Sequence, residues 1–117
     1  MRHQKKHTGL RQTRGYQRSL RVNLLNSLFK HDSIKTTAYK AKILKPLAEK
    51  LLSNAKKKTV QAAVRYLQKY TTEEAVAKKI INDLHKKYES KTSGFIRVTK
   101  LGFREGDAAP VVQIQII

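Results

Sequence analysis

Apolar residues recur every three or four positions in four stretches of the chain, and this spacing predicts four helices. The first stretch covers residues 17–30, where Leu20, Leu24 and Leu28 fall on one face and polar side chains on the other. The second runs from residue 38 to about 57 and has the strongest pattern. Because Pro46 lies inside it, lacks an N–H and crowds the carbonyl four residues earlier, we expect a kink or a restart near residue 45.

Two shorter helices are predicted after the second. Residues 60–70 place Val60, Ala63 and Leu67 on one face. Thr71, followed three residues later by Glu74, has the form of a capping box, in which each side chain accepts a hydrogen bond from the backbone N–H of the other residue. This pair predicts the start of a fourth helix that runs towards residue 88.

Three further stretches have the composition and alternation of strands. Residues 34–37 are rich in β-branched side chains, residues 95–101 alternate between apolar and polar, and residues 111–117 are almost all β-branched. The connector 102–110 contains two glycines, an aspartate and a proline, which indicates a structured turn. Strands this short need helices to pack on. The chain is therefore predicted to be a single α+β domain, 1–117, of two layers, in the order helix, strand, three helices, two strands, with a small three-stranded sheet packed on the helices.

Residues 1–15 lack the apolar side chains that a core needs, and we expect them to form an extended basic arm. The first 30 residues contain eight Lys or Arg and no Asp or Glu. Repulsion among these charges opposes folding of such a segment by itself, whereas phosphate groups order it. The alternative is a solvated tail, but solubility does not require eight cations without one acid.

The net charge of the chain indicates which class of molecule it binds. The chain has 26 Lys and Arg against 8 Asp and Glu, which gives a formal net charge of +18. Residues 1–60 contain 16 basic and 2 acidic groups, so +14 of the +18 comes from this half. Such a protein needs an acidic partner, and nucleic acid is favoured over a membrane because no stretch reaches the roughly 18 to 20 apolar residues that cross a bilayer. We expect a soluble, cytoplasmic protein.

The residue types that support catalysis or metal binding are scarce. Cysteine is absent, which excludes disulfides, thiolate catalysis and cysteine-ligated zinc. His3 and His7 have the spacing of a helical metal pair but no accompanying carboxylates. His31 is next to Asp32 but has no nucleophile to serve, and it is interpreted as a helix C-terminal group. We predict no enzyme, no cofactor, no metal and no small-molecule substrate.

A second basic cluster falls where the predicted strand 34–37 leads into the second helix. Lys35, Thr36, Lys40 and Lys42 lie near the start of that helix, where free backbone N–H groups stabilise anions. The alternative is ordinary capping by Thr37, with the lysines on a solvated face.

Most aromatic residues have the spacing of core positions, which applies to Phe29, Tyr66, Tyr70 and Tyr88. Tyr16 and Phe103 instead follow a glycine and lie close to arginines, so they are candidates for stacking on RNA bases. A basic architectural DNA-binding protein remains the alternative function. The predicted helices, however, place lysines around their exposed faces without the cluster of Asn, Gln and Arg that reads base edges.

Two clusters of residues are similar to one known family. The first comprises the start Met-Arg-His, Ser27-Leu28 with His31, Lys-Thr-Thr at 35–37 and Lys-Ala-Lys at 40–42; the second comprises Gly94-Phe95, Arg97, Lys100, Gly102-Phe103-Arg104, Gly106-Asp107 and Ala109-Pro110. With these residues the chain resembles, over nearly its whole length, the bacterial large-subunit ribosomal protein seventeen family.

The resemblance implies a small α+β structural protein of the large ribosomal subunit, near the peptide-exit side. It implies that large-subunit ribosomal RNA and neighbouring ribosomal proteins are the partners, and that the protein catalyses nothing. It also implies that a set of basic and hydroxyl residues faces RNA: Arg2, His3, Lys5, Lys6, Arg11, Arg14, Arg18, Arg21, Lys35, Thr36, Lys40, Lys42, Arg97, Lys100 and Arg104.

Overall fold

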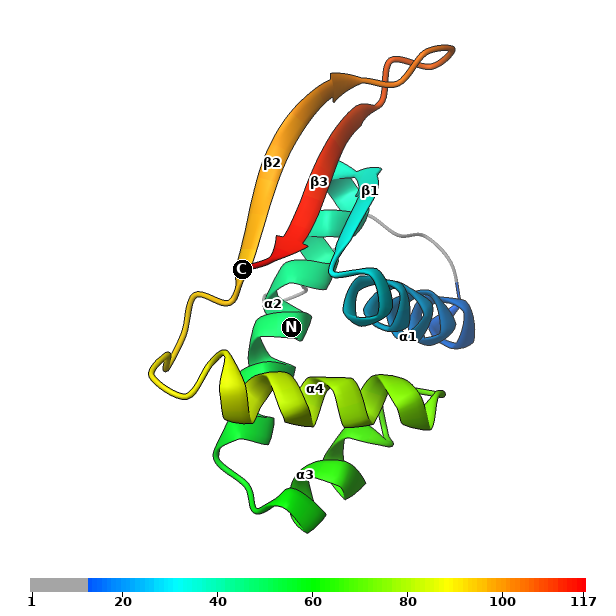
Figure 1. The fold of residues 1–117 in the computed structure, drawn as a ribbon. Coiled ribbons are helices and arrows are strands. Elements are labelled where there is room, and N and C mark those ends of the chain that lie inside the picture. Colours follow the sequence, from blue (N-terminus) through cyan, green and yellow to red (C-terminus); the bar gives the residue numbers. More distant parts are fainter. Residues whose placement is uncertain (1–12) are drawn as a thin grey trace, which may run out of the picture.

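The structure is a computed structural model that describes residues 13–117, apart from the side chains at positions 84 and 85. In chain order, this part of the protein consists of α1 (Arg14–His31), β1 (Ser33–Thr37), α2 (Ala38–Lys56), α3 (Val60–Leu67), α4 (Glu74–Lys86), β2 (Ile96–Phe103) and β3 (Pro110–Ile116). The α+β class and the order of elements are confirmed (Figure 1). Every other element contacts α2, so this helix is the centre of the fold.

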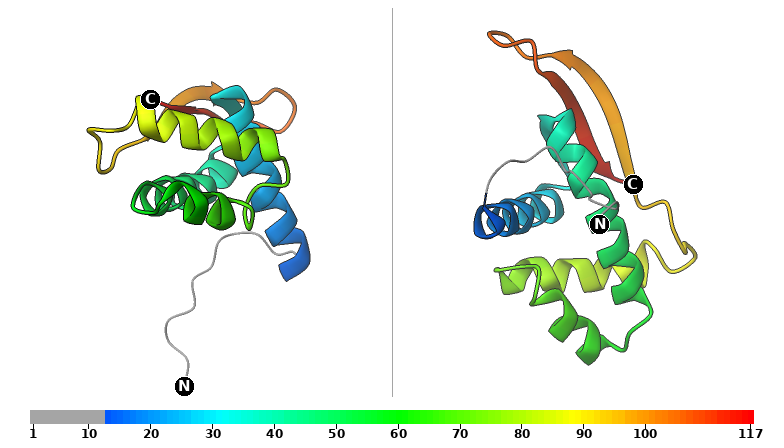
Figure 2. Two further views of the ribbon diagram at one scale, coloured as in Figure 1. Left: turned by 60° about the horizontal axis from the view of Figure 1, so that its bottom comes forward. Right: turned by 180° about the vertical axis from the view of Figure 1, so that it is seen from behind.

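The three strands form one antiparallel sheet in the order β1-β3-β2. Ile114 in the central strand is paired with Ile34 on one side and Val98 on the other, so these three residues share a face. Val112, Ile114 and Ile116 are buried, which identifies this face as the one against the helices. The far half of the β2–β3 hairpin extends beyond the helices (Figure 2).

One hydrophobic core holds the helices and the sheet together. The helices turn their leucines and small residues inwards, as their 3.6-residue period requires. The buried residues include Leu25, Leu28 and Phe29 from α1; Leu44, Ala48, Leu51 and Leu52 from α2; Ala63 and Leu67 from α3; Val76, Ala77, Ile80 and Ile81 from α4; and Tyr88, Phe95, Ile96, Ile114 and Ile116 from the C-terminal part.

A carboxylate of α2 attaches the hairpin to the helices. Glu49 accepts hydrogen bonds from the backbone N–H of Phe95 at 3.2 Å and of Ile96 at 2.9 Å. Charge-assisted bonds of this kind are roughly twice as strong as neutral ones. The half-buried Glu49 therefore fixes where β2 begins relative to α2.

The first helix begins earlier than predicted. Thr13 is the N-cap, and its hydroxyl oxygen accepts a hydrogen bond from the backbone N–H of Tyr16 at 3.3 Å. Arg14 and Gly15 are consequently helical, so the prediction of an extended arm over 1–15 is wrong at its last two residues. The rest of that prediction, 1–12, lies outside the described residues.

The predicted restart near residue 45 is wrong, because α2 continues through Pro46 as one helix. Pro46 is exposed, so its ring does not disturb the packed face. The third helix is also shorter than the predicted 60–70 and ends at Leu67, after which residues 68–70 form turns.

The predicted capping box is wrong. Thr71 is buried, and its hydroxyl donates a hydrogen bond to the carbonyl of Leu67 at 2.9 Å. Thr71 therefore provides a hydrogen bond to a carbonyl at the end of α3 and does not cap the start of α4. The N-cap of α4 is Glu73, whose side chain makes no cap bond. No helix in residues 13–117 has both the length and the hydropathy needed to cross a membrane.

Candidate nucleic-acid interface

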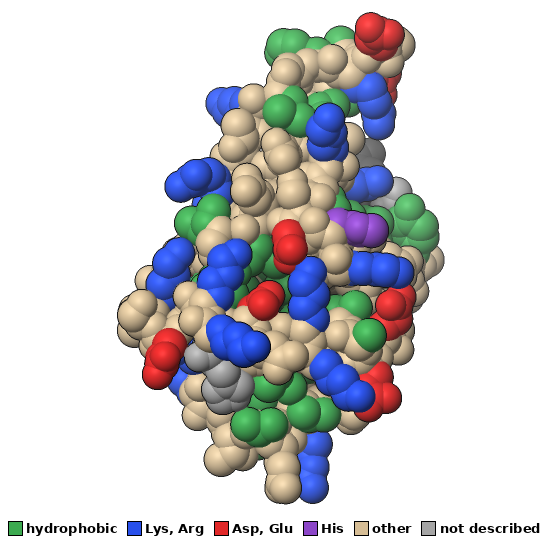
Figure 3. Space-filling view, viewed as in Figure 1, with side chains coloured by type: hydrophobic (Ala, Val, Ile, Leu, Met, Phe, Trp, Pro, Cys, Tyr) green, Lys and Arg blue, Asp and Glu red, His purple; other side chains and the backbone are tan. Residues whose placement is uncertain are grey.

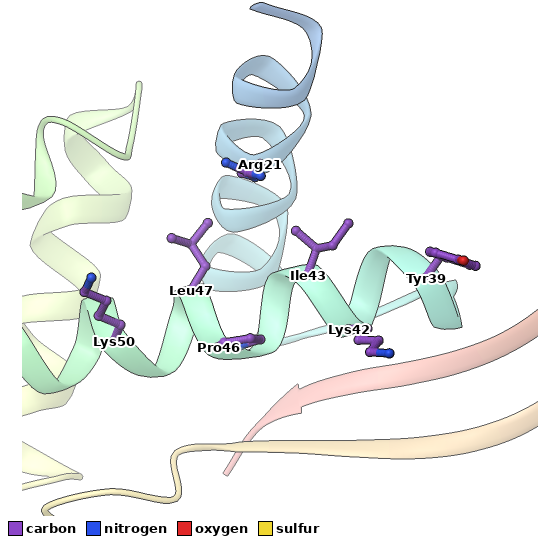
Figure 4. A pocket seen from close by; sticks show the side chains of 7 residues that line it. All are labelled: Arg21, Tyr39, Lys42, Ile43, Pro46, Leu47 and Lys50. Carbon is purple, nitrogen blue, oxygen red and sulfur yellow. The ribbon is translucent and has the colours of Figure 1, made fainter. Parts of the chain in front are cut away.

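A hollow of about 460 Å³ lies between α1 and α2 (Figure 4). Residues of α2 spaced three or four apart line it and so share one side of the helix, opposite the core. Ile43 and Leu47 point towards α1, from which Arg21 approaches, while Tyr39 and Lys50 lie at the two ends. The complete lining is Arg21, Tyr39, Lys42, Ile43, Pro46, Leu47 and Lys50.

A second hollow, of about 490 Å³, adjoins the first and shares Arg21 and Leu47 with it. It lies between α1 and the turn that follows α3, and its lining is Arg18, Arg21, Val22, Leu25, Leu47, Gln68, Lys69 and Tyr70. We call the two hollows together the basic groove, because five cations line it: Arg18, Arg21, Lys42, Lys50 and Lys69.

The groove contains no carboxylate. Neither hollow is lined by Asp or Glu, and none of the five cations forms a salt bridge within residues 13–117. Burial, reinforced by neighbouring Tyr66, raises the pKa of Tyr70. Its phenol therefore stays protonated at neutral pH and adds no negative charge to the groove. The arrangement suits a polyanion with apolar groups, such as nucleic acid.

Acidic residues gather on the side of the molecule formed by α4 and the end of α1. There, Lys78 pairs with Glu74 at 3.3 Å and Lys79 pairs with Asp32 at 3.0 Å. Lys30 lies 3.8 Å from a Glu73 carboxylate oxygen. Figure 3 shows Asp and Glu side chains interspersed with Lys and Arg over this side. Three lysines on this side therefore already have carboxylate partners.

The strand residues that were predicted to contact RNA lie on two opposite faces of the sheet. On the outer face, Lys35 is paired with Gln113, and Arg97 with Gln115, which places both cations on the side away from the helices. Thr36 and Lys100 flank Val112 and belong to the opposite face. Lys35, Arg97 and Lys100 are exposed, whereas Thr36 is half-buried.

Arg104, at the tip of the hairpin, has a partner within its own loop. Its guanidinium donates to Asp107 from Nε at 3.0 Å and from Nη2 at 2.5 Å. These bonds, together with one from the backbone N–H of Ala109, lower the pKa of Asp107 to about 2. The loop thereby neutralises the cation that was predicted to contact RNA, and Glu105 adds a negative charge at the tip.

The structure brings several predicted residues together. Arg14, Arg18 and Arg21 follow one side of α1, and Arg21 and Lys42 both line the first hollow. Lys40 lies in the first turn of α2 but lines neither hollow. Thr37 is the N-cap of α2 but makes no side-chain cap bond.

Sequence reasoning missed Lys50 and Lys69. The spacing of Tyr39, Ile43, Pro46 and Lys50 along α2 was a signal for the first of these, because it marks a stripe opposite the core leucines. Lys69 had no such signal, since it reaches the groove only through the fold of the turn after α3.

Five predicted residues lie outside the described part of the chain: Arg2, His3, Lys5, Lys6 and Arg11. The alternative metal pair His3 and His7 lies there as well. Within the described residues, no group of three or more His, Asp or Glu side chains is placed to hold a metal ion.

Among the aromatic residues, Tyr16 and Phe103 are exposed, as stacking on bases requires. Tyr88 and Phe29 are buried, and Tyr66 and Tyr70 pack on the core, so these four predictions are confirmed. Tyr39 is 61% exposed and lies at the end of the first hollow, which the sequence did not indicate.

Fold and groove together define a small, strongly basic α+β protein with a groove that is lined by cations and by no carboxylate. The family model for ribosomal protein L17 matches residues 20–117. The large ribosomal subunit protein bL17 of Desulforapulum autotrophicum is 41% identical over 117 residues, covering all of this chain and 97% of the relative. The protein of the same name from Pelagibacter ubique is 38% identical over all of this chain and 80% of its own length. The chain belongs to the ribosomal protein L17 family.

Proposed function

We propose that this protein is a structural constituent of the large ribosomal subunit and that it binds ribosomal RNA by neutralising phosphates in the basic groove. Membership of the L17 family supports the first part. The observation that carries the second is the set of five cations around two adjoining hollows without a carboxylate. On this proposal the protein works in the cytoplasm, contacts neighbouring ribosomal proteins and catalyses no reaction.

The groove is one part of a wider RNA-binding surface in this proposal. Arg14 continues the row of α1 arginines towards residues 1–12, whose cations are predicted to bind phosphates. Lys35 and Arg97 provide further cations on the outer face of the sheet. Lys40, Lys100 and Thr36 remain predicted RNA contacts. Arg104 is the weakest member, because Asp107 already occupies its guanidinium.

The salt dependence of RNA binding tests the groove. Each phosphate contact contributes about 0.7 to 0.9 to the slope of log K against log salt concentration. The double variant Arg18→Gln, Lys69→Gln should therefore lower the slope for a large-subunit RNA fragment by about 1.5. The matched control Lys78→Gln, Lys79→Gln removes two α4 cations that are paired with Glu74 and Asp32, and should change the slope by less than about 0.5. Equal changes in both variants would refute the assignment to the groove.

Two further measurements test the remaining parts. Deleting residues 2–12 keeps the Thr13 cap of α1 and should flatten the salt slope by up to about 3.6, since four Lys or Arg are removed. Sucrose-gradient fractionation of a lysate, with mass spectrometry of each peak, should recover the protein with large subunits. Recovery in light fractions or with the chromosome would defeat the ribosomal assignment.

A further inference from the structure

The hollow between α1 and α2 has features that binding a phosphate chain does not require. Its floor is apolar, with Ile43, Pro46 and Leu47 contributing most of it (Figure 4). Its volume of about 460 Å³ lies within the range of roughly 300 to 1,000 Å³ typical of sites for small organic groups. Backbone phosphates alone need only a charged surface.

Tyr39 gives one end of this hollow an aromatic wall. Among the other tyrosines of the described chain, Tyr66 and Tyr70 pack against each other with ring centroids 5.4 Å apart. Tyr88 packs edge-on against Phe95 at 5.2 Å. Tyr39 has no such ring partner within residues 13–117 and is 61% exposed. An exposed aromatic ring next to cations is the arrangement on which nucleic-acid bases stack.

Pro46 adds a hydrogen-bond acceptor. In a regular helix the N–H of residue 46 would donate to the carbonyl of residue 42. Proline has no N–H, so the carbonyl of Lys42 loses that donor, and Lys42 and Pro46 both line the hollow. The amino and imino groups of bases are donors of the kind this carbonyl lacks.

The charges around the hollow favour an anionic occupant. Arg21, Lys42 and Lys50 approach it from two helices, and none has a carboxylate partner among the described residues. An acidic protein segment would satisfy these charges but would make little use of the aromatic wall. A nucleotide supplies a flat ring for Tyr39 and a phosphate on each side of its sugar for the cations.

We propose that the α1–α2 hollow receives one unpaired nucleotide of RNA, with its base against Tyr39 and the apolar floor and its phosphates held by Arg21, Lys42 and Lys50. This inference rests on the proposed function and adds the kind of RNA that the groove selects: a loop, bulge or single strand in which one base is free to leave the stack. The adjoining α1–α3 hollow then holds the neighbouring phosphates through Arg18 and Lys69.

The first test separates stacking from charge. Tyr39→Leu in the full chain should weaken binding to a single-stranded RNA oligonucleotide about tenfold while leaving the salt slope unchanged. Tyr39→Phe keeps the ring and should restore binding to within about twofold. The control Val60→Ala changes an exposed apolar side chain that lines neither hollow, 51% exposed, and should have no comparable effect. Circular dichroism verifies that each variant is folded.

The second test reports on the occupant. The chain has no tryptophan, so Tyr39→Trp introduces a single tryptophan at the hollow, whose fluorescence can be excited separately from that of the remaining tyrosines. Single-stranded RNA should quench it, whereas an abasic oligonucleotide of the same length, added to equal saturation, should not. RNA could bind with a steep salt slope and yet neither quench the Tyr39→Trp variant nor bind Tyr39→Leu more weakly than the wild type. That result would overturn the nucleotide site but leave the proposed function intact. No salt-dependent RNA binding by the wild type would overturn the proposed function itself.

A third probe addresses an acidic protein segment. Polyglutamate should compete weakly, and Tyr39→Leu should not alter its binding, because a carboxylate chain gains nothing from stacking. The nucleotide assignment would be overturned if polyglutamate displaced RNA at equal charge concentration and bound more weakly to Tyr39→Leu than to the wild type. The hollow would then select a peptide.

Discussion

Two sides of this molecule are rich in lysine and arginine, but they differ in how many of their cations have a carboxylate partner within the described residues. On the α4 side, Lys30, Lys78 and Lys79 each have a carboxylate within 4 Å. In the basic groove, Arg18, Arg21, Lys42, Lys50 and Lys69 have none. The two sides therefore differ in the positions of the few acids more than in those of the many bases.

The two sides also differ in shape and chemistry. The groove has an apolar floor between helices, so a bound phosphate chain lies near surface of low polarity, where charge interactions are stronger than in bulk water. The salt bridges of α4 lie on an exposed surface, where a pair contributes about 0 to 1 kcal/mol. A polyanion approaching α4 would have to compete with carboxylates for little gain.

The largest expected effect comes from reversing charge in the groove. Arg21→Glu with Lys50→Glu removes two phosphate contacts and adds two repelling charges, so RNA affinity at about 0.1 M salt should fall by about 50-fold or more. Fluorescence anisotropy with a labelled RNA fragment measures the change. The control Lys78→Glu, Lys79→Glu makes the same change in net charge at two paired cations of α4 and should cost about fivefold at most. Comparable losses would erase the distinction between the two sides.

The next effect concerns the single carboxylate of α2, Glu49, which faces the hairpin instead of the groove. Glu49→Ala leaves the N–H groups of Phe95 and Ile96 without their acceptor and should lower the free energy of unfolding by about 2 kcal/mol. Glu49→Gln keeps one acceptor oxygen and should cost about 1 kcal/mol. Urea denaturation measures both, with exposed Glu89→Ala as the control. An RNA salt slope altered by Glu49→Ala would mean that this carboxylate also belongs to the binding surface.

The hairpin tip provides a test by pH. Because Arg104 lowers the pKa of Asp107 to about 2, the ion pair is complete above the ordinary aspartate pKa of 3.8 and is lost as pH falls through about 2. Arg104→Ala should raise the pKa of Asp107 towards 3.8, which an NMR titration of its carboxyl carbon detects. At neutral pH, Arg104→Gln should change the RNA salt slope by less than about 0.5. A fall near 0.9 would show that RNA displaces Asp107 and that the tip does bind phosphate.

The smallest expected effect is a gain. Glu73→Gln with Glu74→Gln removes the partners of Lys30 and Lys78 and should strengthen non-specific RNA binding about two- to fivefold at low salt. Binding at 50 mM and 200 mM salt measures it, and the gain should vanish at the higher concentration. Unchanged affinity at low salt would contradict the argument that nearby carboxylates prevent the α4 lysines from binding RNA.

Much of the fold was predictable because it depends on local patterns. The core leucines of α1 and α2 repeat at helical spacing, and Val111 to Ile117 is β-branched almost throughout, so these elements follow from sequence. The failures occur where one residue can serve either of two neighbouring elements. Thr71 could cap α4 but instead bonds to the carbonyl of Leu67 at the end of α3.

The candidate site was predictable only in part. Arg18, Arg21 and Lys42 were identified individually, but Lys69 joins them through a turn whose path depends on packing. Glu49 accepts hydrogen bonds from Phe95 and Ile96, which lie 46 and 47 positions further along the chain, so no local pattern in the sequence predicts these bonds. By contrast, the spacing of Arg104 and Asp107 was visible, and the ion pair it forms changes the predicted role of Arg104. Binding chemistry thus depends on which charges meet, which sequence alone shows poorly.

The strand order β1-β3-β2 has a consequence for the order in which the protein is built. The central strand is the last one along the chain, and it pairs Ser33 with Gln115. During synthesis β1 and β2 therefore have no neighbour until β3 emerges, and contacts between such distant residues form slowly. All residues that line the basic groove, by contrast, lie at or before Tyr70. The ribosome therefore synthesises the whole lining of the groove before it synthesises the strand that completes the sheet.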